Sequence, residues 1–446
     1  RNNLPMINIL DDDGCINENG GEFKGMKRFE ARDAIIVALK KLGHFKGSAP
    51  NKMALKTCSR SGDIIEPLLK PQWWVDSKEM ARRAGEAVTN KQLEILPARY
   101  TNTWFEWLRD IRDWCISRQL WWGHRIPAWL VTLHGHAADG ADPNSWVVAR
   151  DETEARAKAE AKFGKDKVAR LEQDPDVLDT WFSSGLFPFS VFGWPDNTTD
   201  LQQYYPTQLL ETGKDILFFW VMRMVMLGLT LTDQLPFKQV FLHPIVRDAH
   251  GEKMAKMKGN VIDPVDVIEG ITLQQLHDGL YKGNLDSRDI EAAIEVQKRD
   301  FPQGISECGT DALRFALCSY IGGQGNDINL DINRVTAYRN FCNKLWNATK
   351  LALTFMGHDF VPAHYSETKR TGHESEWDTW ILGRLQCAVE GANKGFESYE
   401  FGDSTQAIYS FWLYDFCDVY LEAIKPLMAA TSTSSAEARD TIKHTL

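Results

Sequence analysis

The stretch VFLHPIVRDAHGEKMAKMKGNVIDPVD, residues 240–266, decides the fold of this chain. Its first residues are apolar and typical of a buried strand, and a turn signal follows at His250-Gly251. Three lysines come next: Lys253, Lys256 and Lys258. Asp263-Pro264 then signals the start of a helix. A strand that leads into a flexible cationic loop is well suited to holding a polyphosphate. A solvated surface loop explains the same spacing, and that alternative stays open at this point.

Length and composition indicate an ordinary globular protein. The 446 residues are enough for two or three domains, each with its own core. A hydrophobic content of 43% and a charged content of 25% lie in the usual range. The net charge of −10 excludes non-specific polyanion binding by the whole surface, but it leaves room for a local basic face. No G-x-x-x-x-G-K-[ST] motif is present, which excludes a P-loop protein.

The cysteines and the apolar runs exclude further classes. Eight cysteines are dispersed without a C-x-x-C pair, so we expect reduced thiols and neither a zinc ribbon nor a redox motif. The longest apolar run, 216–231, is interrupted by Arg223, which favours a buried helix over a membrane span. Because the chain starts at Arg1 in what resembles the middle of a domain, we expect a partial chain.

The first half of the sequence predicts a mixed pattern of strands and helices. Residues 1–75 are expected to be β-rich with one helix, and the periodicity of apolar residues predicts two further helices after residue 75. The expected strands cover 4–10 and 177–182, with an extended segment at 64–75 and a strand after Pro127. The expected helices cover 29–42, 103–120 and 151–171.

The second half predicts a parallel sheet followed by a helix bundle. A strand at 208–210, the apolar helix 216–231 and a strand at 241–246 form a strand–helix–strand unit, with sites at the carboxyl ends of its strands. From residue 310 onward the apolar spacing predicts helices throughout. These helices cover 311–320, 333–356, 374–396 and 404–428.

Longer segments than the lysine loop carry a family resemblance. The chain resembles the class I aminoacyl-tRNA synthetases, specifically the valyl-tRNA synthetases of eukaryotic, fungal-like type. The matching segments are RNNLPMINILDDDG (1–14), SRSGDIIEPLLKPQWWV (59–75), DWCISRQLWWGHRIPAW (113–129), DVLDTWFSSGLFPFS (176–190), LETGKDILFFWVMRM (210–224) and GNVIDP (259–264). They occur in the family's order, and isoleucyl- and leucyl-tRNA synthetases match them less well.

The resemblance implies an α/β fold, namely the second half of a class I Rossmann-like catalytic domain with an all-α anticodon-binding bundle. It assigns 1–75 to the C-terminal part of a β-rich editing domain and 76–266 to the connective stem and second catalytic half. It assigns 267–309 to a connector and 310–446 to the N-terminal part of the anticodon-binding domain. The family's HIGH-motif half and its editing aspartate have no counterpart in the sequence.

The resemblance also implies roles for the residues that match the family's motifs. Lys253 and Lys256 would be catalytic and bind ATP. His243, Gly259 and Asn260 would complete the ATP site. Asp215 would bind the valine ammonium and Trp220 would wall the side-chain pocket. The alternatives are a core tryptophan in an apolar helix and a structural histidine.

Four cations of the helical part would meet the tRNA backbone: Arg314, Arg334, Arg339 and Lys344. Arginine and lysine on the face of a bundle are more often simply solvated, which is the competing interpretation. Phosphate contacts would make the affinity for tRNA depend on salt.

The implied reaction is ATP-dependent activation of valine, followed by transfer to tRNA(Val), with Mg²⁺ accompanying ATP. Catalysis would rest on positioning and on electrostatic stabilisation of phosphate charge. An apolar pocket discriminates poorly against threonine, which explains an editing domain. We expect a cytoplasmic location, with a mitochondrial form left open, no membrane contact, and translation-associated protein partners.

The lysine loop departs from the family's usual KMSKS form. Ala255 and Met257 stand where the family has serine, and Glu252 stands where it usually has arginine. Lys214 replaces a usually aromatic residue, and its ammonium is expected to pair with Asp215. Two hypotheses therefore stand: a valine–tRNA ligase seen as a partial chain, or a synthetase-derived paralogue that binds tRNA or protein without aminoacylation.

Overall fold

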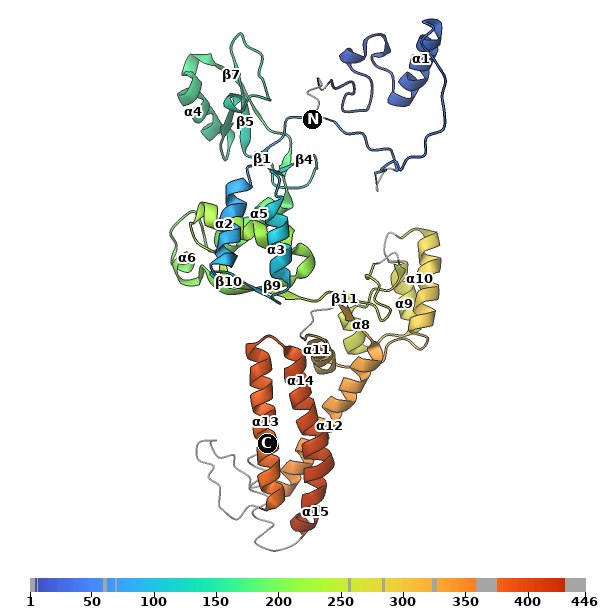
Figure 1. The fold of residues 1–446 in the computed structure, drawn as a ribbon, viewed down its shortest axis with the longest axis vertical. Helices are drawn as coiled ribbons and strands as arrows, with labels where there is room; N and C mark the ends of the chain where they lie inside the picture. The colour runs from blue at the N-terminus through green and yellow to red at the C-terminus, as the bar shows by residue number, and fades with distance from the viewer. Residues whose placement is uncertain are drawn as a thin grey trace. The chain divides into compact units, whose positions relative to one another are not determined.

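The computed structural model describes residues 5, 7–58, 62–68, 70–255, 258–282, 285–322, 327–357 and 375–429 (Figure 1). The chain divides into two compact units. The first unit comprises residues 1–76 and 113–180, and the second comprises 77–112 and 181–446. Residues 59–61, the start of the quoted segment 59–75, lie outside the described residues.

Among its described residues, the first unit contains two α-helices and several short strands. Its elements are η1 (Glu18–Phe23), α1 (Arg28–Lys41), β1 (Trp74–Val75), β3 (Trp114–Cys115), β4 (Ser117–Arg118), β5 (Ala128–Leu133), η2 (Pro143–Ser145), β6 (Trp146–Val148), α4 (Glu152–Phe163), η3 (Lys165–Lys167), β7 (Val168–Gln173) and β8 (Val177–Leu178). Helix α1 and the strand after Pro127 confirm two predictions. The strand expected at 4–10 is wrong for the described residues, where an isolated bridge joins Leu10 to Ile16.

A small antiparallel sheet, in the order β6-β5-β7, packs against α4 in this unit. The side chain of Asp151 caps the start of α4 by accepting a hydrogen bond from the Glu154 amide at 2.9 Å. Ala155 and Ala159, one helical turn apart, are fully buried and turn that face of α4 to the core. The helix ends at Gly164, where φ is +102°. The single helix expected over 151–171 is therefore wrong after residue 163, because 168–173 pairs with β5 instead.

Two further sequence predictions were wrong at the ends of elements. The helix expected over 103–120 ends at Arg109, because the backbone of Trp114 pairs with Val75 and its indole donates to Asp179 at 2.8 Å. The strand expected over 177–182 stops at Leu178, and a helix begins at Thr180. In both segments the spacing of the aromatic residues is typical of one secondary structure, whereas contacts with residues distant in sequence favour another.

The second unit contains a parallel sheet and most of the helices (Figure 1). Its elements up to the lysine loop are α2 (Lys78–Thr89), β2 (Glu94–Leu96), α3 (Tyr100–Arg109), α5 (Thr180–Ser190), α6 (Thr199–Tyr204), β9 (Thr207–Gly213), η4 (Lys214–Ile216), η5 (Leu217–Met222), α7 (Arg223–Leu231), β10 (Phe237–His243) and β11 (Val246–Arg247). Those after the loop are α8 (Pro264–Glu269), α9 (Leu273–Leu280), α10 (Ser287–Asp300), α11 (Thr310–Ser319), β12 (Ile328–Asn329), α12 (Ile332–Met356), α13 (Glu376–Glu397), α14 (Phe401–Ser410), η8 (Phe411–Tyr420) and α15 (Leu421–Ala429).

The three-stranded sheet has the order β2-β10-β9 and is parallel throughout, as predicted. β10 is the central strand, and its residues Val240 and Leu242 are almost completely buried. α2, α3 and the apolar α7 pack with them around one core. Residues 221–228 are buried except for Arg223, which is half-buried, and such a mostly apolar stretch suits a helix with little exposed surface. The sheet thus has covered faces, and its strand ends are left for the site.

The helices predicted after residue 310 are confirmed as α11, α12, α13 and the run from α14 to α15. α11 packs on α12 and α14, and α13 packs along α14 (Figure 1). The eight cysteines, all within the described residues, form no disulfide. Across the described parts of the chain, none of the helices is both long and apolar enough to cross a bilayer.

Trp104 provides a test of the core around β10. It is completely buried, and within the described residues its Nε1 has no acceptor. Trp104→Ala should lower the free energy of unfolding by about 3–5 kcal/mol, because a large cavity is created. Trp104→Phe should cost about 1–2 kcal/mol, since it also removes an unsatisfied donor. Urea unfolding of both variants measures this, and equal losses for the two would contradict the packing described.

Candidate functional site

The carboxyl ends of β9 and β10 form the floor of the candidate site. His243 ends β10 directly opposite Gly213, which ends β9. A Cβ atom on Gly213 would lie within 4 Å of Asp215 Oδ1, His243 Cε1 and Ile245 Cδ1. The absence of a side chain at Gly213 therefore lets Asp215 and His243 approach the same point. Strand ends of a parallel sheet are where α/β proteins bind ligands.

The His243 ring is held by the backbone and by a neighbouring acid. Its Nδ1 lies 2.8 Å from the carbonyl oxygen of Pro244, which can only accept, so Nδ1 carries the proton. Its Nε2 lies 3.4 Å from Glu211 Oε1. About a third of the ring is exposed, which leaves it available to a ligand.

The lysine loop is closed at its base by a buried pair of side chains. Asn260 Nδ2 donates to Asp248 Oδ2 at 2.8 Å and to the Lys253 carbonyl at 3.4 Å. Its Oδ1 accepts from the Ala255 amide at 2.9 Å. Asp248 and Asn260 are only 7% and 4% exposed. All of these Asn260 contacts are made to the loop itself, so this residue shapes the loop.

Asp248 organises the turn that leads into the loop. Its Oδ1 accepts from the amides of His250 and Glu252 at 3.0 and 2.8 Å, and Gly251 turns with φ of +81°. Burial pushes the pKa of Asp248 upward, but the hydrogen bonds from Asn260 and the two amides outweigh it and lower the pKa. The carboxylate thus stays ionised and holds the turn.

The loop lysines differ in their partners. Lys253 is exposed, and no acid among the described residues pairs with its ammonium. Lys258 pairs with Glu252 at 2.9 Å, so the acid that departs from the family pattern has its own counter-ion. Lys256 lies outside the described residues, as does Met257.

A three-residue ion network ties the loop to the end of β9. Asp327, just before β12, pairs with both Lys214 and Arg247. The expectation that Lys214 pairs with Asp215 is therefore corrected, since its ammonium lies on Asp327 instead. Burial raises the pKa of Asp327, but the hydrogen bonds from Lys214 and Arg247 dominate and bring the pKa down to about 2. Asp215 remains exposed.

The apolar side of the site lies on the turn after Asp215. The chain passes through the 3₁₀ turn η4 and the π-helical turn η5, an irregularity often found at functional sites. Trp220, on η5, is half-buried and donates its indole N–H to the Ser184 carbonyl at 3.1 Å. Phe219 stacks on Trp181 with 6.0 Å between ring centroids. The rings of Phe219 on η5 and Trp181 on α5 therefore pack against each other on the segment that follows β9.

Gly259 at the loop exit has a structural reason to be glycine. Its φ is +66°, and an added Cβ would lie 2.4 Å from the Cβ of Ala293 on α10. Helix α10 therefore approaches the backbone of Gly259 closely. A larger residue would push the loop exit away from that helix.

The four cations proposed for tRNA do not form one face. Arg334 donates to Ser319 Oγ at 3.0 Å and its guanidinium lies 4.1 Å from the Tyr320 ring centroid. Lys344 pairs with Asp418 at 2.7 Å, whereas Arg314 and Arg339 are exposed. Steps of five residues along α12 separate Arg334, Arg339 and Lys344 by about 140° each.

Sequence reasoning missed Asp248, Arg247, Asp327 and Glu211. The position of Asp248, directly after a strand and before the lysine loop, was a usable signal for a strand-end carboxylate. Asp327 lies 80 residues beyond Arg247 in sequence, so nothing local pointed to it.

Comparisons with known families cover most of the chain. The family described as tRNA synthetases class I (I, L, M and V) matches residues 22–331. The family described as the anticodon-binding domain of tRNA ligase matches residues 378–446.

Curated relatives are valine–tRNA ligases. That of Rattus norvegicus is 56% identical over 99% of this chain and 35% of its own length. That of Schizosaccharomyces pombe is 53% identical over 99% of this chain and 45% of its own length. A mitochondrial valine–tRNA ligase of Saccharomyces cerevisiae is 52% identical over 99% of this chain and 40% of its own length. The chain thus spans less than half the length of these relatives.

Solved structures share the fold. A Mycobacterium tuberculosis methionyl-tRNA synthetase in complex with methionyl-adenylate aligns with a TM-score of 0.57 at 17% identity, over 88% of this chain and 60% of that one. A second structure of this synthetase, bound by the same adenylate, gives a TM-score of 0.56 at 14% identity over 88% of this chain and 61% of that one.

The ion network at Asp327 makes the free energy of unfolding depend on pH in the acidic range. The folded-state pKa lies below the ordinary 3.8, so ionised Asp327 stabilises the fold above about pH 4, and this contribution is lost as the pH falls toward 2. Asp327→Asn should reduce the difference in unfolding free energy between pH 6 and pH 3 by about 1–2 kcal/mol. Urea unfolding at both pH values measures it. Lys214→Met, which removes one partner, should retain part of the dependence. An unchanged dependence in Asp327→Asn would contradict the assignment.

Proposed function

The chain belongs to the class I tRNA synthetases of the isoleucine, leucine, methionine and valine group, and from that membership we propose that it acts in a valine–tRNA ligase. One observation carries the proposal. Over 99% of the chain, more than half of the aligned residues are identical to those of valine–tRNA ligases. The arrangement at the ends of β9 and β10 supports it. There His243 and the exposed carboxylate of Asp215 lie close to the same point, and the Asp327 network links the strand before the lysine loop to Lys214.

The proposed reaction begins with attack of the valine carboxylate on the α-phosphate of ATP. This forms valyl-adenylate and releases pyrophosphate, and the valyl group then passes to tRNA(Val). No side chain needs to act as a nucleophile, so the protein contributes position and charge. Lys253, exposed and without an acidic partner among the described residues, suits the stabilisation of phosphate charge. His243 and the second motif lysine, Lys256, complete the proposed phosphate contacts.

Valine would bind on the aromatic side of the same site. Asp215 is exposed near the point that His243 faces, so its carboxylate is free to meet the substrate ammonium. Trp220 would wall the side chain, and its bond to Ser184 fixes the plane of the indole. A pocket of this kind selects by shape and discriminates poorly against threonine. An editing domain, of which residues 1–75 are proposed to be a part, would compensate for this poor discrimination against threonine.

Gly259 and Asn260 would serve ATP indirectly. Their contacts run to α10 and to the loop, so in this proposal they fix the loop's shape rather than touch phosphate.

Mg²⁺ would enter with the nucleotide. Across the described ranges, no group of three or more His, Cys, Asp and Glu residues forms a metal cage. Mg²⁺ commonly binds through substrate phosphates and keeps several waters, which fits such a site. When bound, the ion would neutralise charge on the phosphates.

The helical part would bind tRNA(Val). The match of 378–446 to the anticodon-binding family supports this assignment for α13–α15. Of the four candidate cations, Arg314 and Arg339 are the more available to phosphate, since Arg334 and Lys344 have partners in the protein. The proposed domain boundaries are those that the resemblance implies: the editing part ends at residue 75, the catalytic half at residue 266 and the connector at residue 309. Both cytoplasmic and mitochondrial locations remain within the proposal, because one relative above is named mitochondrial.

A second candidate is a related protein that binds tRNA or a protein partner without aminoacylation. The missing serine hydroxyls at Ala255 and Met257 favour it. The two other departures from the family pattern, Glu252 and Lys214, are weaker evidence against aminoacylation than the sequence alone suggested. Glu252 is neutralised by Lys258 and Lys214 by Asp327, so neither opposes a phosphate or the substrate ammonium as a free charge.

Substitution of the loop lysines separates the two candidates. In the complete protein, Lys253→Ala should lower valine-dependent ATP–pyrophosphate exchange by about 100-fold, because a charge at the phosphates is lost. Replacement of the whole ion pair, Lys258→Met together with Glu252→Gln, is the matched control, because it leaves no unpaired charge and exchange should change by less than about three-fold. Absence of exchange in the unaltered complete protein would instead support the second candidate.

A further inference from the structure

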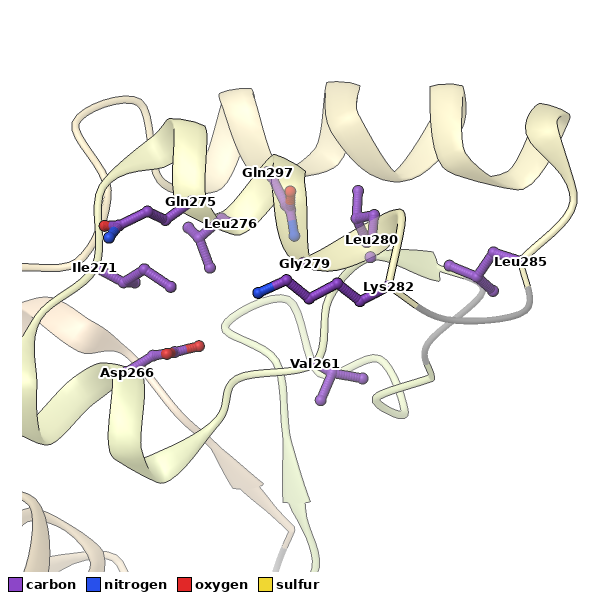
Figure 2. Close-up of a pocket in the computed structure, with 11 residues that line it drawn as sticks. Val261, Asp266, Ile271, Gln275, Leu276, Gly279, Leu280, Lys282, Leu285 and Gln297 are labelled. Carbon is purple, nitrogen blue, oxygen red and sulfur yellow. The ribbon is translucent and has the colours of Figure 1, made fainter.

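A cavity lies between the exit of the lysine loop and helices α8, α9 and α10 (Figure 2). Its volume is about 690 Å³, within the range of small-molecule sites. Five apolar side chains line it, together with the polar side chains of Asp266, Gln275, Lys282 and Gln297; the apolar ones are Val261, Ile271, Leu276, Leu280 and Leu285. None of the residues proposed above for valine lines it.

Gln297 is a buried polar group without a partner in this cavity. Its side chain hangs from α10 into the space in Figure 2, and the residue is only 5% exposed. Within the described residues its Oε1 has no hydrogen-bond donor. Buried amide groups are normally paired, and in Figure 2 the nitrogen end of the Gln297 amide lies on the side of the open space, where a ligand group can meet it.

Two charges of opposite sign face the same space. Asp266, on α8, has no cation within ion-pair distance among the described residues. Burial, with smaller effects from Asp263 and Glu269, raises the pKa of its carboxyl. Lys282, after α9, is exposed and points its ammonium into the cavity in Figure 2. No described acid pairs with Lys282, so the two charges do not neutralise each other.

We propose that this cavity binds a zwitterionic small molecule with an apolar body, the chemistry shared by free aliphatic amino acids and short apolar peptides. The ligand ammonium meets Asp266, its carboxylate meets Lys282, and Gln297 supplies an amide to either group. The apolar walls take the body of the ligand. A simple amine would leave Lys282 unpaired and a simple acid would leave Asp266 unpaired, whereas a zwitterion pairs both.

The cavity also borders the lysine loop. Gly259 lines it and packs against Ala293 on α10, the helix that carries Gln297. A ligand in the cavity therefore contacts the loop exit directly. The site is separate from the proposed valine site, so it stands whether or not the protein is a ligase.

Calorimetry and hydrogen exchange on the complete protein, without ATP, test the proposal. The probes are L-leucine and L-leucyl-L-leucine, with 3-methylbutylamine and 4-methylpentanoate as analogues that each lack one charge. At least one zwitterion should bind and protect peptides covering α8–α10 from exchange, and each analogue should bind at least about ten-fold more weakly. The tighter of the two zwitterions identifies the source as amino acid or peptide. No binding by either zwitterion, or equal binding by the analogues, would overturn the proposal.

Variants locate the binding. Asp266→Asn, Lys282→Met and Gln297→Leu should each weaken it by about ten-fold or more. Glu291→Gln and Lys298→Met, on the exposed surface of α10, are matched controls and should leave it unchanged. Gln297→Leu removes an unpartnered oxygen, so it should keep the thermal unfolding midpoint and report on binding alone. Binding at the proposed valine site would instead protect 207–215 and would persist in Lys282→Met, which would overturn the assignment of the ligand to this cavity.

Discussion

The hydrogen bond between Asn260 and Asp248 is the interaction on which the site depends. Both side chains are buried, and between them they satisfy four backbone groups of the loop and its turn, including the carbonyl of Lys253. A lysine-rich loop without such a clamp would lose its shape to chain entropy. Because the charge of Asp248 is compensated by hydrogen bonds from the loop itself, closing the loop also solves the problem of burying a carboxylate.

The clamp acts together with the ion network at Asp327. That network joins the strand next to the loop to the residue that follows β9, so the loop and the floor of the site are parts of one arrangement. It also shows how changes in sequence can be accommodated. A lysine at 214 and a glutamate at 252 each gain a partner of opposite charge nearby. Neither departure therefore leaves an unpaired charge at the candidate site, even though its loop differs from the family pattern.

Local sequence patterns predicted the parts of the fold that depend on local chemistry. The strand, the turn, the helix capped by Asp263 and the apolar helix after Asp215 all follow from residues close in sequence. The helix over 103–120 failed because Trp114 keeps helical spacing while its backbone pairs with β1. The helix over 151–171 failed because the partner of β7 is β5, which lies about forty residues earlier. Of the site, the lysines and His243 were visible in the sequence. Asp327 was not, because only the folded chain brings it to Arg247.

The central claim is that the clamped loop and the ends of β9 and β10 form one site for an adenylate. Hydrogen exchange of the complete protein, with and without a non-hydrolysable valyl-adenylate analogue, tests this most directly. The account predicts protection of residues 207–215 and 243–255 by the analogue, and loss of the protection at 243–255 in Asn260→Ala. Protection confined to other parts of the chain, or equal protection in Asn260→Ala, would contradict it.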